Sequence, residues 1–325
     1  MKITRLFLAA TAVATVAAML GAPAARAQTK TVAITAIVEH PALDATRDGV
    51  IDALKAAGFT PGQDLRIDYQ SAQGNPATAA QIARQFVGAR PDVIVPISTP
   101  SAQAVVAATR DIPVVFTAVT DPVGAQLVKS MEKPGANVTG VSDMAPVAEH
   151  VALIREIVPA TKRVGVLYNP GEPNSVSLVK VLKEAAAAAG LSVVEATATK
   201  SADAQSAARS LVGKADVLYV PLDNTVVSAL ESVVAVGRQS KLPVFSADTD
   251  SVARGAVASI GFDYRQVGQQ TGEAVVRILK GEKPGDIDAV HAKGTDLFVN
   301  PTSAAAMGIS IPEAVTGRAT RIVGQ

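Results

Sequence analysis

Cysteine is absent from the 325 residues, and aromatic residues make up only 3% of them. Without cysteine the protein can form no disulfide framework and can carry no lipid at a cysteine cleavage site. The three histidines, His40, His150 and His291, lack metal-ligand spacing, so no metal site is expected. His150 lies on a helical face and is expected at the surface. The fold must therefore depend on its apolar core, for which 48% apolar residues provide enough material.

An excess of charge of one sign is also missing. Lys and Arg number 30 against 29 Asp and Glu, which leaves a net charge of +1, and no basic run occurs. Nucleic-acid binding is therefore not expected. The sequence has no G-x-S-x-G, P-loop or G-x-G-x-x-G motif, so no cofactor and no catalytic residue is expected, and the protein is predicted not to be an enzyme. The alternative is a catalytic Ser–His–Asp arrangement assembled from distant loops, which no local motif would reveal.

The first residues have the pattern of a secretory signal peptide. Lys2 and Arg5 precede an apolar stretch over 6–20, and Ala25–Ala27 has the small-x-small form of a cleavage site. The alternative is a membrane anchor, but an apolar stretch of about 15 residues is shorter than the ~20 that a span needs. We therefore expect export to the periplasm, with cleavage after Ala27.

Apolar strand-like runs alternate with helix-like stretches along the rest of the chain, and the order repeats. Pro91–Pro96 resembles Ala215–Pro221, and Ile112–Phe116 resembles Leu242–Phe245. The repeat unit exceeds about one hundred residues, which indicates a doubled domain rather than a solenoid. Strands are predicted over 32–38, 65–70, 93–97, 112–116, 137–142, 164–168, 191–195, 216–220, 242–245 and 297–300. Helices are predicted over 42–57, 77–88, 102–109, 176–189, 204–212 and 266–280.

This alternation predicts an α/β fold with two doubly wound parallel-sheet lobes. Lobe 1 is assigned residues 28–140 with 264–296, and lobe 2 residues 141–263 with 297–325. Segments that cross between the lobes, such as Asn137–Ser142, would form a multi-strand hinge that permits closure but little twisting. A monomer is expected.

Polar residues follow nearly every predicted strand, where open α/β sheets place their ligands. Hydroxyl groups at helix N-termini can hold a carboxylate, and aspartates can accept hydrogen bonds from an ammonium group. Each of these residues has a more ordinary explanation as a helix cap or a turn residue. Tyr168, beside a polar loop, can present both a flat ring and a hydroxyl. The candidates from this reasoning are Ser98, Thr99, Ser101, Thr117, Asp121, Tyr168, Ser175, Asp223 and Asp248.

Nine segments, taken in order, carry a resemblance to a known family: 38–44, 47–50, 97–104, 116–123, 137–142, 168–175, 222–226, 261–264 and 268–272. They resemble the solute-binding proteins of ABC importers with the type I periplasmic binding fold. Within that family, the chain is most similar to the branch that binds tryptophan or tyrosine. The resemblance implies a cleft that captures one amino acid or related carboxylate, closes, and presents it to a permease in the inner membrane. It implies as site residues Ser98, Thr99, Ser101, Ser175, Asp223 and Asp248, and it adds Asn174 and Asn224.

Three other functions stay open at this point. A periplasmic sensor that reports its ligand state to a signalling receptor would use the same cleft. A periplasmic enzyme could be built on a similar scaffold. A sugar-binding or DNA-regulator relative is less favoured, because no helix-turn-helix precedes Val32 and aromatic residues for sugar stacking are few.

Overall fold

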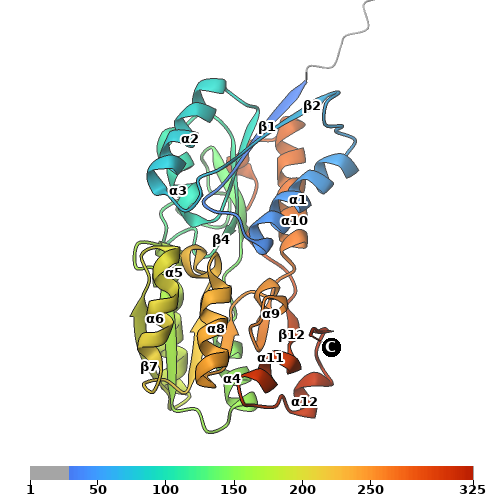
Figure 1. Ribbon diagram of the computed structural model, residues 1–325. Helices are drawn as coiled ribbons and strands as arrows, with labels where there is room; N and C mark the ends of the chain where they lie inside the picture. The colour runs from blue at the N-terminus through green and yellow to red at the C-terminus, as the bar shows by residue number, and fades with distance from the viewer. Residues whose placement is uncertain (1–28, 325) are drawn as a thin grey trace, which may run out of the picture.

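The computed structural model describes residues 29–324, and the signal peptide predicted over 1–27 lies outside them. Two α/β lobes are stacked end to end, as Figure 1 shows. The chain enters in the upper lobe, builds the lower one, and returns to the upper lobe through α10 before it ends in the lower. Two doubly wound lobes were predicted from the alternation of strands and helices, and the α/β architecture with parallel sheets confirms the fold class.

Lobe 1 contains one parallel sheet, with the order β11-β5-β4-β3-β1-β2 in the described part of the chain. Its central strand β3 is apolar throughout, and all five of its residues are buried, because helices cover both faces of the sheet. The strands are β1 (Lys30–Ala36), β2 (Leu65–Ser71), β3 (Val93–Ile97), β4 (Val114–Val119), β5 (Val138–Ser142) and β11 (Val290–His291). The helices are α1 (Pro41–Ala56), α2 (Pro76–Ala89), α3 (Thr99–Ala108), α10 (Tyr264–Leu279) and the short η2 (Pro284–Asp286).

Lobe 2 has a second parallel sheet, in the order β7-β6-β8-β9, and a small sheet in which β10 and β12 run antiparallel. The antiparallel pair departs from the purely parallel prediction, because the chain returns from lobe 1 and runs back beside β10. The strands are β6 (Arg163–Tyr168), β7 (Ser192–Thr197), β8 (Val217–Val220), β9 (Val244–Ser246), β10 (Ala258–Gly261), β12 (Asp296–Val299) and β13 (Arg321–Ile322). The helices are α4 (Val147–Ile157), α5 (Pro173–Ala188), η1 (Ser201–Asp203), α6 (Ala204–Leu211), α7 (Asn224–Val227), α8 (Leu230–Ser240), α9 (Asp250–Ala253), α11 (Pro301–Ala306) and α12 (Glu313–Thr316).

The lobes are joined by segments that follow β5, β10 and β11. Within residues 29–324 these crossings are 143–146, 262–263 and 292–295. The predicted lobe boundary after residue 140 falls inside β5, so Val141 and Ser142 belong to the sheet of lobe 1. Because the crossings lie beside one another, the hinge has several strands, and it allows the lobes to close more readily than to twist.

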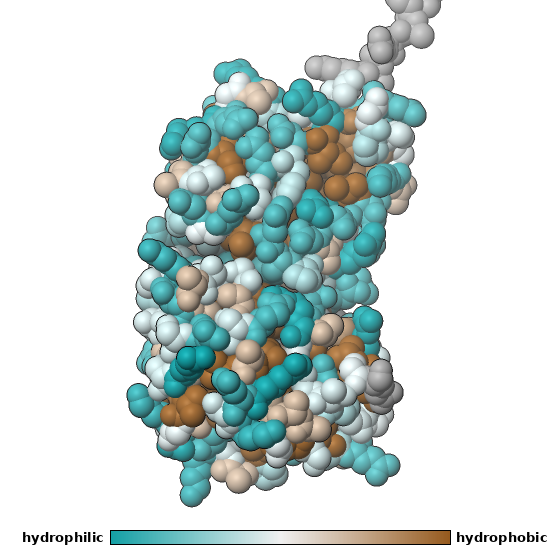
Figure 2. Space-filling view, viewed as in Figure 1, coloured by the Kyte–Doolittle hydropathy of each residue, from teal (hydrophilic) through white to brown (hydrophobic). Residues whose placement is uncertain are grey.

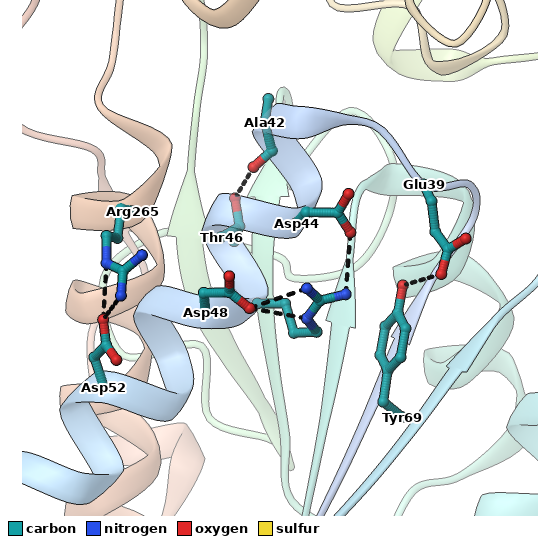
Figure 3. A network of polar contacts seen from close by, with 9 residues as sticks. Glu39, Ala42, Asp44, Thr46, Asp48, Asp52, Tyr69 and Arg265 are labelled. Carbon is teal, nitrogen blue, oxygen red and sulfur yellow. Dashed lines mark hydrogen bonds and ion pairs between the residues drawn. The ribbon is translucent and has the colours of Figure 1, made fainter.

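Helices α1 and α10 lie side by side on one face of the sheet of lobe 1 (Figure 1). Three glycines allow this close approach: a Cβ at Gly268 would overlap the carbonyl oxygen of Thr46, one at Gly49 the carbonyl oxygen of Arg265, and one at Gly272 the side chain of Ala53. An ion pair between Arg265 and Asp52 further joins the two helices, as Figure 3 shows.

His150 is not at the surface, as the sequence suggested, but is buried between α4 and the second sheet. Its Nδ1 lies 2.8 Å from the Tyr219 hydroxyl and its Nε2 lies 2.5 Å from the Ile260 carbonyl oxygen. Because a carbonyl oxygen can only accept, Nε2 carries the proton and Nδ1 accepts from the phenol. Burial lowers the pKa of His150 to about 4. The residue is therefore part of the core of lobe 2, where it ties α4 to β10.

The visible surface is mixed in character. Figure 2 shows polar side chains over most of the viewed face, with apolar ones in separate small patches. The most exposed large apolar residues, Val123, Val176, Val212, Val290 and Ile322, lie on different elements or loops. In residues 29–324, no helix is both long enough and apolar enough to cross a bilayer.

Candidate ligand-binding site

A cavity lies between the two lobes and is lined by residues from both. The space between its walls, counted together with the open solvent at its mouth, is about 360 Å³. Its apolar wall is made by residues such as Leu43 of α1 and by Leu222 and Val227 beside and in α7. Its polar lining comes from the carboxyl ends of strands, where the sequence predicted the ligand to lie, and also from the crossings.

On lobe 1 the cavity is bounded by the start of α3. Ser98 lines it directly, with φ of 77°, a left-handed conformation that a non-glycine residue rarely adopts. The hydroxyl oxygens of Ser98, Thr99 and Ser101 are buried and have no hydrogen-bond partner within the described chain. Buried polar groups are normally paired. Together with the free amides at the N-terminus of α3, these hydroxyls can hold a carboxylate.

The end of β4 also reaches the cavity, but through residues other than those predicted. The pairing of β4 with β5 shifts register between Phe116 and Val119, and Ala118 has φ of 50°. This irregularity places Ala118 and Thr120 on the cavity wall. Thr117 points instead toward α10, where its hydroxyl oxygen lies 2.8 Å from that of Thr271.

On lobe 2 the cavity is bounded by the start of α7, where Asp223 is fully buried. Its Oδ2 accepts from the Asn169 amide and the Ser175 hydroxyl, both at 2.6 Å, and its Oδ1 accepts from the Val226 amide at 2.7 Å. Burial and the neighbouring Glu172 carboxylate raise the pKa of Asp223. Asp223 is therefore both the N-cap of α7 and a carboxylate on the cavity wall.

Two further aspartates line the cavity. Asp248 accepts from the amide and the hydroxyl of Ser251, at 2.8 and 2.6 Å, and burial raises its pKa. Asp143 lies on the crossing after β5 and accepts from the hydroxyl of Tyr264 at 3.0 Å and that of Thr120 at 3.4 Å. Burial raises the pKa of Asp143 to about 6. Since Tyr264 begins α10, this hydrogen bond joins two of the three crossings at the cavity itself.

His40 lines the cavity at the start of α1 and stays neutral. Its Nδ1 is enclosed without a partner in the described chain, and burial lowers the pKa of the imidazole to about 3. Contacts close to His40 stabilise the turn that carries it. Arg47 pairs with Asp44 and Asp48, and Tyr69 donates to Glu39 (Figure 3). Among the described residues that line the cavity there are three carboxylates and no Lys or Arg, so a cationic group of a ligand would be favoured there.

Five of the residues predicted from the sequence line the cavity: Ser98, Asn174, Asp223, Asn224 and Asp248. Thr99, Ser101 and Ser175 are buried beside them. Three predicted residues lie elsewhere, because other groups hold their side chains. Thr117 pairs with Thr271, Asp121 accepts from the Gly124 amide at 2.8 Å in a turn, and the Tyr168 hydroxyl donates to Glu195 of β7 at 2.9 Å.

The sequence reasoning missed His40, Thr120, Asp143 and Tyr264. His40 and Thr120 lie in strand-end loops that the sequence does indicate, so only the choice of side chain was missed. Asp143 follows a crossing strand, and no motif marks it. Within residues 29–324, no cluster of three or more His, Asp or Glu side chains could hold a metal ion.

The chain is similar to a known protein family and to relatives of known structure. The family model described as ABC transporter substrate binding protein matches residues 31–323. A tyrosine-binding protein of Clostridioides difficile (strain R20291) is 42% identical over 271 residues, which are 83% of this chain and 79% of that protein. The crystal structure of an ABC domain from Streptococcus pneumonia in complex with L-Trp superposes with a TM-score of 0.88 at 35% identity. That match covers 91% of this chain and 100% of that one.

A third relative bears on the arrangement of the lobes. The ligand-free, open structure of a substrate-binding protein with adhesive properties from Clostridium difficile is 43% identical, with 91% of this chain and 100% of that chain covered. Its TM-score is nevertheless only 0.69, below the 0.88 of the L-Trp complex. The structure as a whole therefore superposes better on the L-Trp complex than on the open form.

Proposed function

The chain belongs to the ABC transporter substrate-binding protein family, and on that premise we propose that it captures an aromatic amino acid in the cavity between its lobes. The observation that carries the proposal is the polarity of the cavity. Unpaired buried hydroxyls lie at the N-terminus of α3 on one side, and three buried aspartates lie on the hinge and lobe 2. An α-amino acid carries both an anionic and a cationic group, which such a cavity would separate and hold.

The proposed pose follows from these groups. The ligand carboxylate lies against Ser98 and the first amides of α3, and the ammonium lies among Asp143, Asp223 and Asp248. The side chain lies against the apolar wall that includes Leu43 and Leu222. Because the two ends of the ligand are held by different lobes, its affinity is higher for the closed arrangement, and binding shifts the population toward closure.

The choice of an aromatic side chain is supported by the relatives. The protein from Clostridioides difficile is named for tyrosine binding, and the solved structure from Streptococcus pneumonia holds L-Trp. Both matches span most of this chain. The rings on the described cavity wall that could face an aromatic ligand are those of Tyr264 and His40.

The same proposal covers location and partners. The charged start, apolar middle and Ala25–Ala27 site support export to the periplasm with cleavage after Ala27. There the protein, as a monomer without enzymatic activity, would deliver its ligand to an ABC permease in the inner membrane. The family assignment favours this role over that of a sensor for a signalling receptor.

Calorimetry and thermal shift with L-tyrosine, L-tryptophan, L-phenylalanine and glycine would test the ligand class. We expect at least one aromatic amino acid to bind and to raise the melting temperature, with no such effect from glycine. Ser98→Ala should weaken binding by about 0.5–1.5 kcal/mol, the net contribution of one hydrogen bond. Tyr168→Phe, whose hydroxyl lies outside the cavity, is the matched control. Absence of binding by all three aromatic amino acids would contradict the proposal.

A further inference from the structure

Glu172, immediately before α5, is a buried carboxylate to which the sequence reasoning assigned no role. Only 5% of the residue is exposed. Its Oε1 accepts from the amide and hydroxyl of Thr225, at 3.0 and 2.7 Å. Its Oε2 accepts from the amide and the side-chain Nδ2 of Asn224, at 3.0 and 2.6 Å, and from Nδ2 of Asn174 at 3.2 Å. Glu172 does not line the cavity, but Asn174 and Asn224 do.

These contacts decide which way the two amides face. Oε2 already accepts from the backbone amide of Asn224, and an asparagine oxygen has no proton to donate to it, so both asparagines turn their NH₂ groups toward Glu172. Nδ2 of Asn174 also donates to the Leu222 carbonyl at 2.7 Å, and a carbonyl imposes the same orientation. The oxygen Oδ1 of Asn174 is thereby turned away from Glu172. It is buried and has no partner within residues 29–324.

We propose that Glu172 is a positioning residue that makes the cavity select ligands carrying an ammonium group. By holding the NH₂ groups of Asn174 and Asn224, it leaves their oxygens as the amide atoms available to the ligand. The inference rests on the proposed function, because it assigns the source of amino-acid selectivity in that same site. It adds two oriented acceptors to the three aspartates on the cavity wall.

The amides of Asn174 and Asn224 therefore present acceptor oxygens, and no donors, to the cavity. A ligand with an ammonium satisfies them. A ligand of the same shape without one leaves buried acceptors unpaired, which is far more costly than losing a contact of similar area. Rejection of des-amino analogues is therefore built into lobe 2, whereas the carboxylate is recognised by lobe 1 at Ser98 and α3.

The experiment compares Glu172→Gln with the wild type against a matched pair of ligands. L-tyrosine carries the ammonium, and 3-(4-hydroxyphenyl)propionate has hydrogen in its place. If L-tryptophan is the tighter ligand, it and 3-(indol-3-yl)propionate form the pair. Glutamine is nearly isosteric but carries an NH₂ group, which faces donors whichever way it turns. At the place of Oε2 it meets the donors of Asn174 and Asn224 and reverses their amides, and at the place of Oε1 it meets the amide of Thr225.

In the variant we expect the dissociation constant for the amino acid to rise about tenfold or more, and that for the des-amino analogue to change by less than about threefold. The preference for the amino acid should therefore shrink. Glu195→Gln, a lobe 2 glutamate that pairs with Lys183 and Tyr168 away from the cavity, should keep the wild-type preference.

A purely structural role for Glu172 would give a different result. The affinities for both ligands would then fall by the same factor or not at all, so the preference for the amino acid would stay as in the wild type. That outcome overturns the inference. If Glu172→Gln does not fold, Asn174→Ala provides the same comparison with the other Glu172 contacts intact. A wild-type protein that binds neither ligand would overturn the proposed function itself, which separates the two failures.

Discussion

Asp143 lies on a crossing between the lobes and also lines the cavity. It accepts a hydrogen bond from Tyr264, at the start of the next crossing, and no cationic side chain lies beside it on the described cavity wall. Burial disfavours its charged form and raises its pKa to about 6. In the unfolded chain an aspartate has a pKa of about 3.9, so this group makes the ligand-free fold less stable as pH rises from about 4 to about 6.

Ligand binding should be affected by pH in the opposite sense. An ammonium in the cavity favours the ionised carboxylate, so binding below the pKa of Asp143 must release a proton. The pKa values of Asp223 and Asp248 on the same wall are raised as well. We therefore expect affinity for the amino acid to fall as pH decreases through about 6, where Asp143 takes up its proton, by up to about tenfold per unit for each proton released on binding. Calorimetry in buffers of different ionisation enthalpy measures both the affinity and the proton count.

Asp143→Asn is the test variant, since an amide cannot titrate in this range. Its binding should be weaker at pH 7.5 and should depend less on pH between 5 and 7. A wild-type affinity that stays constant from pH 5 to 8 would show that Asp143 does not pair with the ligand.

Single residues also show where sequence reasoning stops. The loop after β4 could be predicted to reach the site, but Thr120 replaces Thr117 there because the backbone at Ala118 departs from strand geometry. Tyr168 is directed away by Glu195 of the adjacent strand, a contact between segments 27 residues apart. Such outcomes depend on pairing register and on distant partners, which no local pattern records.

At the scale of elements, the contact between α1 and α10 depends on residues without side chains. Gly49, Gly268 and Gly272 lie where a Cβ would overlap the facing helix. Gly268 is within α10 and is buried. Helices this close gain dispersion contacts along their backbones, but they cannot admit even one methyl group without moving apart.

Gly268→Ala should therefore destabilise the protein by about 1–3 kcal/mol, the usual cost of overpacking, even though alanine favours helices. Urea unfolding followed by circular dichroism measures the change. Gly88→Ala in α2 is the control: nothing lies within 4 Å of a Cβ there, and stability should be unchanged or slightly higher. Equal effects of the two substitutions would show that α1 and α10 can separate at little cost.

Most elements could be predicted because buried parallel strands are short apolar runs and the helices between them have regular spacing. The run at β3 was expected over 93–97 and is observed there. The antiparallel pairing of β10 with β12 could not be predicted, since it depends on where the chain re-enters lobe 2. α7 is only four residues long, and its start is set by Asp223 and Glu172, two side chains that read locally as turn residues.

At the scale of the molecule, the two lobes meet around the cavity, and residues of both line it. The structure superposes better on the L-Trp complex than on the open, ligand-free relative, although its sequence identity to the former is lower. In solution without ligand, the hinge should allow the lobes to separate.

We therefore expect small-angle X-ray scattering to show a larger radius of gyration without ligand than with a saturating aromatic amino acid. The scattering curve of the saturated protein should agree with the present structure. A control titration with glycine should leave the curve unchanged. An unliganded curve that already fits this structure would mean that the lobes rest closed.

The return of the chain to lobe 1 has a consequence for synthesis. α10 covers α1 and the first sheet, yet it begins at residue 264 of 325. Before α10 has been synthesised, α1 has no helix packed against it. Neither lobe can therefore finish folding until most of the chain has been synthesised. Because folding is completed late, the chain stays unfolded for longer. An unfolded chain is what can pass through the narrow translocation pore that its proposed export requires.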